Sequence, residues 1–166
     1  MQRRAVLEID GVATPVVSAG PEGESEAVVC LHGNPGYSAD WFDLMARVAP
    51  FARIVAPDMP GFGDAAKLDG FDYSPAGYTR HLTALLAALG VERAHLICHD
   101  FGVAWGLGWA VANADKVASL TLVNVGVLPG YRWHWAARAW RTPMLGELLM
   151  ATTTRAGFAM SLSATN

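Results

Sequence analysis

The sequence predicts an α/β fold: a mostly parallel sheet with helices on both faces, preceded by a β-hairpin. After the hairpin, short apolar runs alternate with segments of helical length, which is the pattern of parallel strands joined by crossover helices. The runs are continuous rather than alternating, as in strands buried on both faces. Three of them end in loops rich in Gly, Pro, Asn or Asp. The apolar runs comprise residues 27–31, 53–56, 95–98 and 117–123.

The opening hairpin is predicted from a turn signal between two apolar stretches. Asp10-Gly11 separates residues 6–9 from residues 12–17. The Asp-Gly dipeptide favours the tight primed turn that joins two antiparallel strands. We therefore expect antiparallel pairing at the start of an otherwise parallel sheet.

The helices are predicted from the residues at their ends. Ser38 can cap a helix over residues 38–48, because a serine oxygen accepts hydrogen bonds from the first free N–H groups. Ser74-Pro75 has the cap and the first-turn proline of a second helix, which stops before Gly90. A third helix is predicted over residues 103–113.

The pattern changes after Asn124. Aromatic residues then cluster among arginines, and the remaining periodicity is weak, with a short helix predicted over residues 142–150. We therefore expect residues 1–124 to form the first part of the α/β core and residues 125–166 to begin a separate helical subdomain. In this prediction the sheet is incomplete at its C-terminal side. The aromatic cluster comprises Tyr131, Trp133, Trp135 and Trp140.

Composition limits the classes of function. The chain has 166 residues, of which 52% are hydrophobic and 16% charged, and its net charge is −3. Nucleic acid is not an expected partner because no basic block occurs. No apolar run reaches about eighteen residues and no signal segment is recognisable, so we expect a cytoplasmic protein without a membrane contact. Cys30 and Cys98 lie in predicted buried strands and are expected as free thiols. No metal or cofactor is expected.

One stretch carries the strongest chemical signal. The strand over residues 95–98 runs into His99-Asp100-Phe101-Gly102, and a helix follows. A strand, a sharp turn and a helix form a nucleophile elbow, in which the turn lifts one side chain clear of the sheet. The usual motif is Gly-x-Ser-x-Gly; here Asp100 replaces the serine, Cys98 replaces the first glycine, and Gly102 remains. The alternative is that Asp100 only caps the helix.

Three loops are expected to meet at one edge of the sheet. Residues 32–36, 58–63 and 99–102 each follow a predicted strand, and ligands of such sheets bind outside the carboxyl ends of the strands. Asp100 can act as a carboxylate nucleophile that forms an ester. The backbone N–H groups of Asn34 and Phe101 would then stabilise developing negative charge. Each loop alone is also compatible with an ordinary turn.

Together the loops resemble the α/β-hydrolase fold family, and more closely its branch with an aspartate nucleophile, the epoxide hydrolases and haloalkane dehalogenases. The resemblance rests on His32-Gly33-Asn34-Pro35, residues 58–63 and His99-Asp100-Phe101-Gly102, and extends to the start of a helical cap domain. It implies attack of Asp100 on a carbon of a small apolar substrate, then hydrolysis of the ester by water that a histidine activates. It also implies a cis bond before Pro35. His32, Pro35 and Trp133 are candidates for the substrate pocket.

Within this branch the resemblance favours the epoxide hydrolases. Dehalogenases hold the leaving halide with the Asn of the first motif and with a Trp after the nucleophile. Asn34 fits that role, but Phe101 has no indole N–H to donate. Epoxide hydrolases vary at that position and protonate the epoxide oxygen with tyrosines of the cap. Tyr131 falls in the predicted cap, but the resemblance does not align it with that role. Asn124 stands where some dehalogenases have their catalytic acid. Haloalkane dehalogenase chemistry is kept as the alternative.

The histidines do not supply the base that the resemblance implies. Family members continue well beyond this length, and we expect their acid and histidine beyond residue 166. The chain is therefore expected to be a hydrolase fragment without turnover, or else a non-catalytic remnant that binds small apolar molecules or a partner chain. A strand over residues 117–123 at the sheet edge would favour self-association or pairing with a complementary C-terminal segment. The histidines are His32, His81, His95, His99 and His134.

Overall fold

The computed structural model of the chain describes residues 1–125, 130–132 and 135–154. The chain divides into two compact units, Met1–Leu128 and Pro129–Asn166. This division falls a few residues after the boundary that the sequence predicted between residues 124 and 125. Within the described residues, no helix has both the length and the apolar character needed to cross a membrane.

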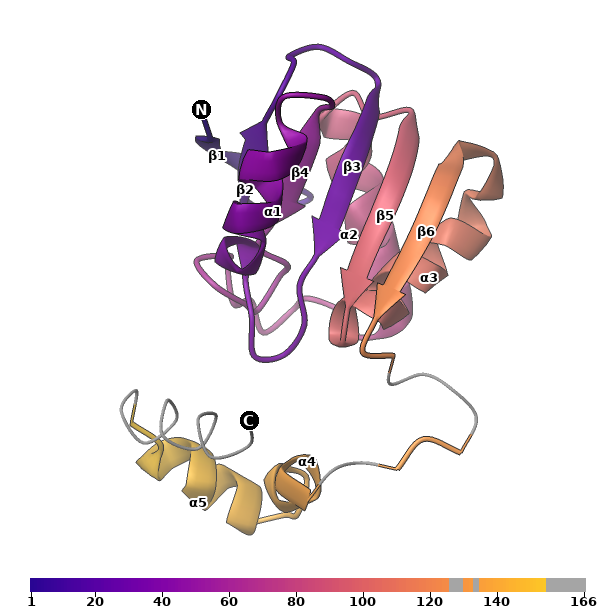
Figure 1. Cartoon of the computed structure of the whole chain (residues 1–166). Helices are drawn as coiled ribbons and strands as arrows, with labels where there is room; N and C mark the ends of the chain where they lie inside the picture. Colours follow the sequence, from indigo (N-terminus) through magenta and orange to yellow (C-terminus); the bar gives the residue numbers. More distant parts are fainter. Residues whose placement is uncertain (126–129, 133–134, 155–166) are drawn as a thin grey trace. The chain divides into compact units, whose positions relative to one another are not determined.

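The first unit contains a six-stranded sheet with the spatial order β1-β2-β4-β3-β5-β6 (Figure 1). β1 pairs antiparallel with β2, and β2 pairs antiparallel with β4. The neighbouring pairs β4 and β3, β3 and β5, and β5 and β6 are parallel. The predicted α/β class with a mostly parallel sheet is therefore confirmed. The strands are β1 (Arg3–Ile9), β2 (Val12–Ala19), β3 (Glu26–Leu31), β4 (Ile54–Pro57), β5 (Arg93–His99) and β6 (Val117–Val123).

The opening hairpin is present with the turn that the sequence predicted. Ile9 pairs with Val12, so only two residues form the loop. Those residues, Asp10 and Gly11, have φ angles of 50° and 81°. Positive φ at both central positions is the requirement of the primed turn, and it explains why Asp-Gly occurs there.

The helices connect the strands largely as predicted. The Ser74 hydroxyl accepts a hydrogen bond from the Gly77 N–H at 3.2 Å, which confirms the predicted cap, and Gly90 has a φ of 65° after the helix end. Ser38 does not cap a helix, because it lies inside a short 3-10 turn, η1 (Ser38–Trp41), that precedes the α-helix. The helices of the first unit are α1 (Phe42–Val48), α2 (Pro75–Ala88) and α3 (Phe101–Ala112), with a second 3-10 turn, η2 (Ala114–Lys116).

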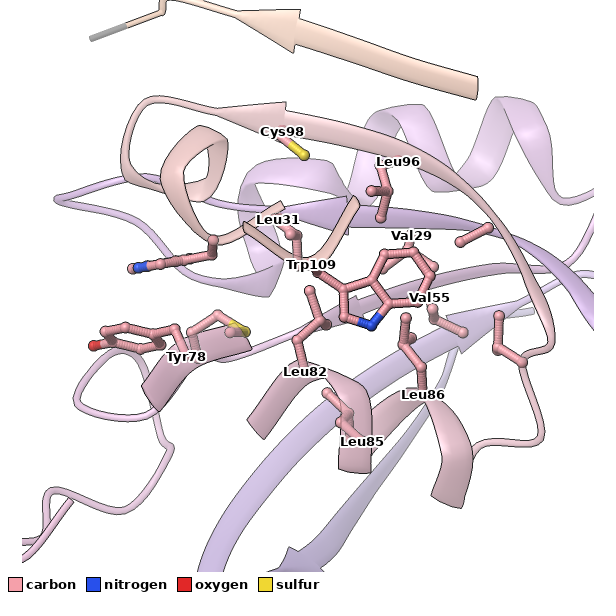
Figure 2. Close-up of a cluster of buried hydrophobic side chains, with 14 of the residues drawn as sticks. Val29, Leu31, Val55, Tyr78, Leu82, Leu85, Leu86, Leu96, Cys98 and Trp109 are labelled. Carbon is pink, nitrogen blue, oxygen red and sulfur yellow. The ribbon is translucent and has the colours of Figure 1, made fainter. Parts of the chain in front are cut away.

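Helices cover the sheet on both faces. Helix α1 lies on one face, and α2 and α3 lie on the other (Figure 1). The larger core is between the sheet and α2 and α3, where strand residues meet helix residues (Figure 2). Burying a Leu or Val side chain stabilises a fold by roughly 1.5–3 kcal/mol, so this layer holds α3 firmly against the strands. The strand side contributes Val29, Leu31, Val55, Leu96 and Cys98, and the helix side contributes Tyr78, Leu82, Leu85, Leu86 and Trp109.

Strand β6 is one edge of the sheet among the described residues. It pairs with β5 on one side, and it has no further strand partner in the described part of the chain. Leu120 is 36% exposed and Val123 is 43% exposed. An apolar edge strand with free backbone groups is a template for pairing with another strand.

The described part of the second unit contains two short helices, α4 (Trp135–Trp140) and α5 (Leu145–Thr152). Thr142 accepts a backbone hydrogen bond from Gly146, and Gly146 packs directly against the Trp140 carbonyl. A side chain at Gly146 would collide with that carbonyl, so the glycine permits the tight connection. The helical character predicted for this region is present in the described residues.

Candidate active site

The turn between β5 and α3 holds Asp100 in an uncommon conformation. β5 ends at His99 and α3 begins at Phe101, and Asp100 between them has φ 51° and ψ −115°. Such a conformation costs a non-glycine residue about 1–3 kcal/mol. It is held on both sides, because the Asp100 N–H donates to Val123 O at 3.1 Å and its carbonyl accepts from the Val103 N–H at 3.0 Å. The predicted strand, turn and helix are confirmed, and the Asp100 side chain makes no cap bond to α3.

Two glycines allow the elements around Asp100 to approach closely. A Cβ atom on Gly102 would lie 2.6 Å from the His32 carbonyl oxygen, so only glycine lets α3 start against the end of β3. A Cβ atom on Gly33 would lie 2.5 Å from the Asp100 Cβ and 2.8 Å from its Oδ1. Ordinary van der Waals contact begins near 3.4 Å. The loop after β3 therefore presses its backbone directly onto the Asp100 side chain.

The same loop provides a hydrogen-bond donor to the carboxylate. The backbone N–H of Asn34 donates to Oδ1 of Asp100 at 2.9 Å. Phe101 is the first residue of α3, and the first N–H groups of a helix have no partner within the helix. The structure thus places the first and third predicted loops together. The bond between Asn34 and Pro35 is cis, as the resemblance implied.

His32 lies beneath this loop and is completely buried. The Met59 N–H donates to its Nε2 at 3.1 Å, so the proton of the neutral ring is on Nδ1, which donates to the Gly33 carbonyl at 2.9 Å. Burial lowers the pKa of His32 below its usual value of 6.5, which favours this neutral form. Both ring nitrogens are used within the protein. His32 therefore supports the loop in the described structure, and its predicted part in a substrate pocket stays a prediction.

Asp58 organises the loop after β4, and sequence reasoning assigned it no such role. Its buried carboxylate accepts the Ser38 N–H at 2.8 Å and the Asp64 N–H at 3.0 Å. Arg4 Nη2 is 3.9 Å from the same carboxylate and also pairs with Asp64. These bonds satisfy the buried charge and join the loops after β3 and β4. The available signal was a carboxylate directly after a buried strand, in a loop dense in glycine.

A pocket of about 450 Å³ lies beside the start of α3 and has a largely aromatic lining. Phe101, 37% exposed, is one of its walls, and Trp105 stacks on Tyr78 with ring centroids 4.6 Å apart. The Tyr78 hydroxyl donates to the Pro60 carbonyl at 2.9 Å, and burial raises its pKa to about 12. The pocket therefore offers apolar ring surfaces. Phe62 and Tyr73 complete the aromatic lining.

The other predicted site residues are placed as follows. Pro35 is exposed next to Asn34, and Trp133 lies outside the described residues. His81 is buried, with Nε2 3.2 Å from the Thr14 hydroxyl. His95 lies between Ser119 and Glu26 on the sheet, and its ring nitrogens are 2.8 and 2.9 Å from these side chains.

The acidic, sulfur and imidazole groups were compared with the arrangements that hold metal ions, in the part of the chain that the structure describes. There, no group of three or more His, Cys, Asp or Glu residues is arranged to hold a metal ion. Cys30 and Cys98 are free and buried. Burial raises the pKa of each thiol to about 12, so neither is a reactive thiolate at neutral pH.

A mostly parallel sheet with helices on both faces and a sharp turn between β5 and α3 is the arrangement of the α/β-hydrolase fold, and comparison with known proteins agrees. The family model described as alpha/beta hydrolase fold matches residues 26–163, most of the chain. The chain therefore belongs to the alpha/beta hydrolase fold family.

Similar proteins include haloalkane dehalogenases and an epoxide hydrolase. A haloalkane dehalogenase of Mesorhizobium japonicum is 32% identical over 157 residues, covering 89% of this chain and 50% of that protein. Among solved structures, haloalkane dehalogenase DatA from Agrobacterium tumefaciens C58 has a TM-score of 0.74 at 27% identity, covering 90% of this chain and 52% of that one. Epoxide hydrolase VrEH1 from Vigna radiata has a TM-score of 0.70 at 25% identity, covering 77% and 40%. The chain thus spans about half the length of these relatives.

Proposed function

We propose that the protein is a hydrolase in which the Asp100 carboxylate attacks an electrophilic carbon of a small apolar organic molecule and forms a covalent ester. The observation that carries the proposal is the arrangement at the turn after β5. Asp100 is held at positive φ, outside the helix that follows, and its Oδ1 accepts the Asn34 N–H at 2.9 Å. A carboxylate is ionised at neutral pH and needs no base to act as a nucleophile.

The donors around Asp100 support the second half of the proposed reaction. When water attacks the ester carbonyl, negative charge develops on the oxygen that the Asn34 N–H already faces. A preorganised N–H at that point is worth about 10²–10³ in rate in a comparable enzyme. The Phe101 N–H, at the positive end of α3, would be the second donor.

Epoxides are the substrate class that we propose first. Halide departure needs donors for the leaving anion, and the Phe101 side chain supplies none. An epoxide keeps its oxygen attached to the carbon chain, so it requires a proton rather than a halide pocket. The aromatic pocket beside Phe101 supports an apolar substituent on the substrate.

Haloalkane dehalogenase chemistry is the second candidate, and a specific observation favours it. The Mesorhizobium japonicum relative, matched over 89% of this chain, is a haloalkane dehalogenase. Asn34 is exposed beside Asp100, where its side-chain amide would hold a halide. In both candidates Asp100 forms an ester with the attacked carbon; an epoxide gives a hydroxyalkyl ester that keeps the oxygen, and a haloalkane gives an alkyl ester and a free halide.

We also propose that the 166-residue chain forms the ester without turning it over. Ester hydrolysis needs a general base. Of the five histidines, His32 and His81 are buried, and His95 is engaged by Glu26 and Ser119 on the sheet. His99 is the last residue of β5, and His134 lies outside the described residues. In the whole protein the base and its acid would come from residues outside this chain. Two buried free thiols fit a reducing compartment, and we propose the cytoplasm.

The test is to react the chain separately with one epoxide and one haloalkane and to measure the intact mass of the protein over time. Styrene oxide should add one equivalent to the chain, and 1-bromohexane should add less in the same time. Asp100→Asn is the matched control, because asparagine keeps the volume and tolerates positive φ. Faster addition from 1-bromohexane would make dehalogenase chemistry the better proposal. No Asp100-dependent addition from either compound would contradict the proposal itself.

A further inference from the structure

We infer that His32 is a positioning residue that aims the Asn34 N–H at Asp100, by fixing the peptide group between Gly33 and Asn34. The inference rests on the proposed function for its chemical meaning, but the contacts that carry it are independent of any substrate. His32 does not touch Asp100 through its ring, and it acts through one peptide plane.

The first step is the hydrogen bonding of the ring. The Met59 N–H donates to Nε2 at 3.1 Å, which leaves Nε2 without a proton. The proton of a neutral imidazole is then on Nδ1, and Nδ1 donates to the Gly33 carbonyl at 2.9 Å. The loop after β4, through Met59, therefore fixes the tautomer of His32. This tautomer allows Nδ1 to donate to Gly33 in the loop after β3. The second nitrogen of a functional histidine commonly has this orienting role.

The second step is the geometry of the peptide group. The Gly33 carbonyl and the Asn34 N–H belong to the same planar unit, and in a trans peptide they point in opposite directions. The only cis bond in the described residues is the next one, between Asn34 and Pro35. A donor that holds the Gly33 oxygen on the buried side therefore directs the Asn34 hydrogen to the other side, where Asp100 Oδ1 lies 2.9 Å from the nitrogen.

The third step is that the peptide group after Gly33 needs an external restraint on its rotation. Gly33 has no side chain, because a Cβ there would lie 2.5 Å from the Asp100 Cβ. Glycine has the largest freedom of φ and ψ, so the plane that follows it is the easiest to rotate. His32, rigid in a layer with Phe62 and Trp105 at centroid distances of 5.4 and 5.5 Å, supplies the restraint that the missing side chain cannot.

Two substitutions separate positioning from simple core filling. In His32→Asn, the side-chain N–H₂ reaches the place of Nδ1, so the Gly33 bond is kept and the Met59 bond is lost. In His32→Gln, the side-chain oxygen reaches the place of Nε2, so the Met59 bond is kept and the Gly33 bond is lost. Each variant loses one hydrogen bond. A purely structural role predicts similar effects, whereas positioning predicts damage in His32→Gln alone.

The first readout needs no substrate. The amide proton of Asn34 is followed by NMR, because donation to a carboxylate moves its resonance downfield. We expect the wild-type resonance in His32→Asn and an upfield shift in His32→Gln. His81→Gln is the control for placing glutamine at another buried histidine, and it should leave the Asn34 resonance unchanged.

The second readout uses the trapped ester on Asp100. Hydroxylamine nitrogen attacks the ester carbonyl, the bond to the alcohol oxygen breaks, that oxygen takes a proton from water, and Asp100 remains as a hydroxamate. The attack develops the oxyanion that the Asn34 N–H faces. Since one such donor is worth about 10²–10³, a misdirected one should slow this release by about tenfold or more in His32→Gln, with His32→Asn within about threefold of wild type.

The outcomes decide the inference separately from the proposed function. If the wild type forms no ester, the proposed function fails, and the Asn34 resonance still decides whether His32 aims the donor. An unchanged Asn34 resonance in a folded His32→Gln chain overturns the inference, as does equal loss in both variants. If His32→Gln does not fold, His32→Asn decides alone: a retained Asn34 resonance supports positioning, and its loss in a folded chain overturns it.

Discussion

Gly33→Ala should disable the site with little damage to the rest of the fold. The new Cβ would lie 2.5 Å from the Asp100 Cβ, against an ordinary contact distance of at least 3.4 Å. Asp100 or the loop must therefore move by roughly 1 Å, and a misplacement of that size costs about 10²-fold in rate. The crowding itself should lower the free energy of unfolding by about 1–3 kcal/mol.

The assay is the rate of ester formation with excess styrene oxide, read by intact mass, beside urea unfolding of the same samples. Gly70→Ala is the matched control, because no atom lies within 4 Å of a Cβ built there and its φ is ordinary for any residue. We expect an unchanged rate in Gly70→Ala and a loss of about 10²-fold in Gly33→Ala. A folded Gly33→Ala chain that reacts at the wild-type rate would refute the claim that this contact positions Asp100.

Three further predictions concern other parts of the molecule. Burial lowers the pKa of His81 to about 4, so as the pH falls the unfolded chain binds a proton at this residue before the folded chain does. The free energy of unfolding should therefore fall by up to about 3 kcal/mol between about pH 6.5 and pH 4. Denaturant titrations should show a smaller fall in His81→Gln. Phe101→Trp adds an indole N–H beside Asn34, and ester formation from 1-bromohexane should accelerate by roughly tenfold, since a hydrogen bond to a charged group is worth about 1.5–3 kcal/mol; an unchanged rate would remove the halide argument. The β6 edge should make the chain self-associate, and Leu120→Lys should reduce the mass seen by light scattering, whereas a wild-type monomer would contradict this.

The fold was predictable because its signals are local. Asp10-Gly11 and Ser74-Pro75 mark turns and caps whose geometry depends on a few neighbouring residues, and the structure confirms both. Ser38 illustrates the limit of such signals. It was a plausible helix cap, but its N–H is taken by Asp58, a residue twenty positions away that belongs to another loop. The contact with Asp58 overrides the local preference of Ser38 for a helix cap, and a local sequence pattern carries no information about such a distant partner.

The site was predictable only in part for the same reason. Asp100 stands out because a strand, a turn and a helix are local features, and Asn34 follows from a loop that leaves the next parallel strand. The burial of His32 depends on Met59 and on the aromatic rings around it, all of which are distant in sequence. A histidine that the sequence placed only at the start of a loop is therefore a buried support in the structure. The hydrogen bond from His32 to the Gly33 carbonyl could be recognised only in the folded structure.

One measurement tests most directly whether Asp100 is the nucleophile. The chain is treated with styrene oxide, digested, and the modified peptide is fragmented in the mass spectrometer to locate the adduct. We predict a single adduct on the Asp100 carboxylate that hydroxylamine removes and that is absent from folded Asp100→Asn. An adduct on another residue, or one that persists in Asp100→Asn, would contradict the assignment of Asp100 as the nucleophile.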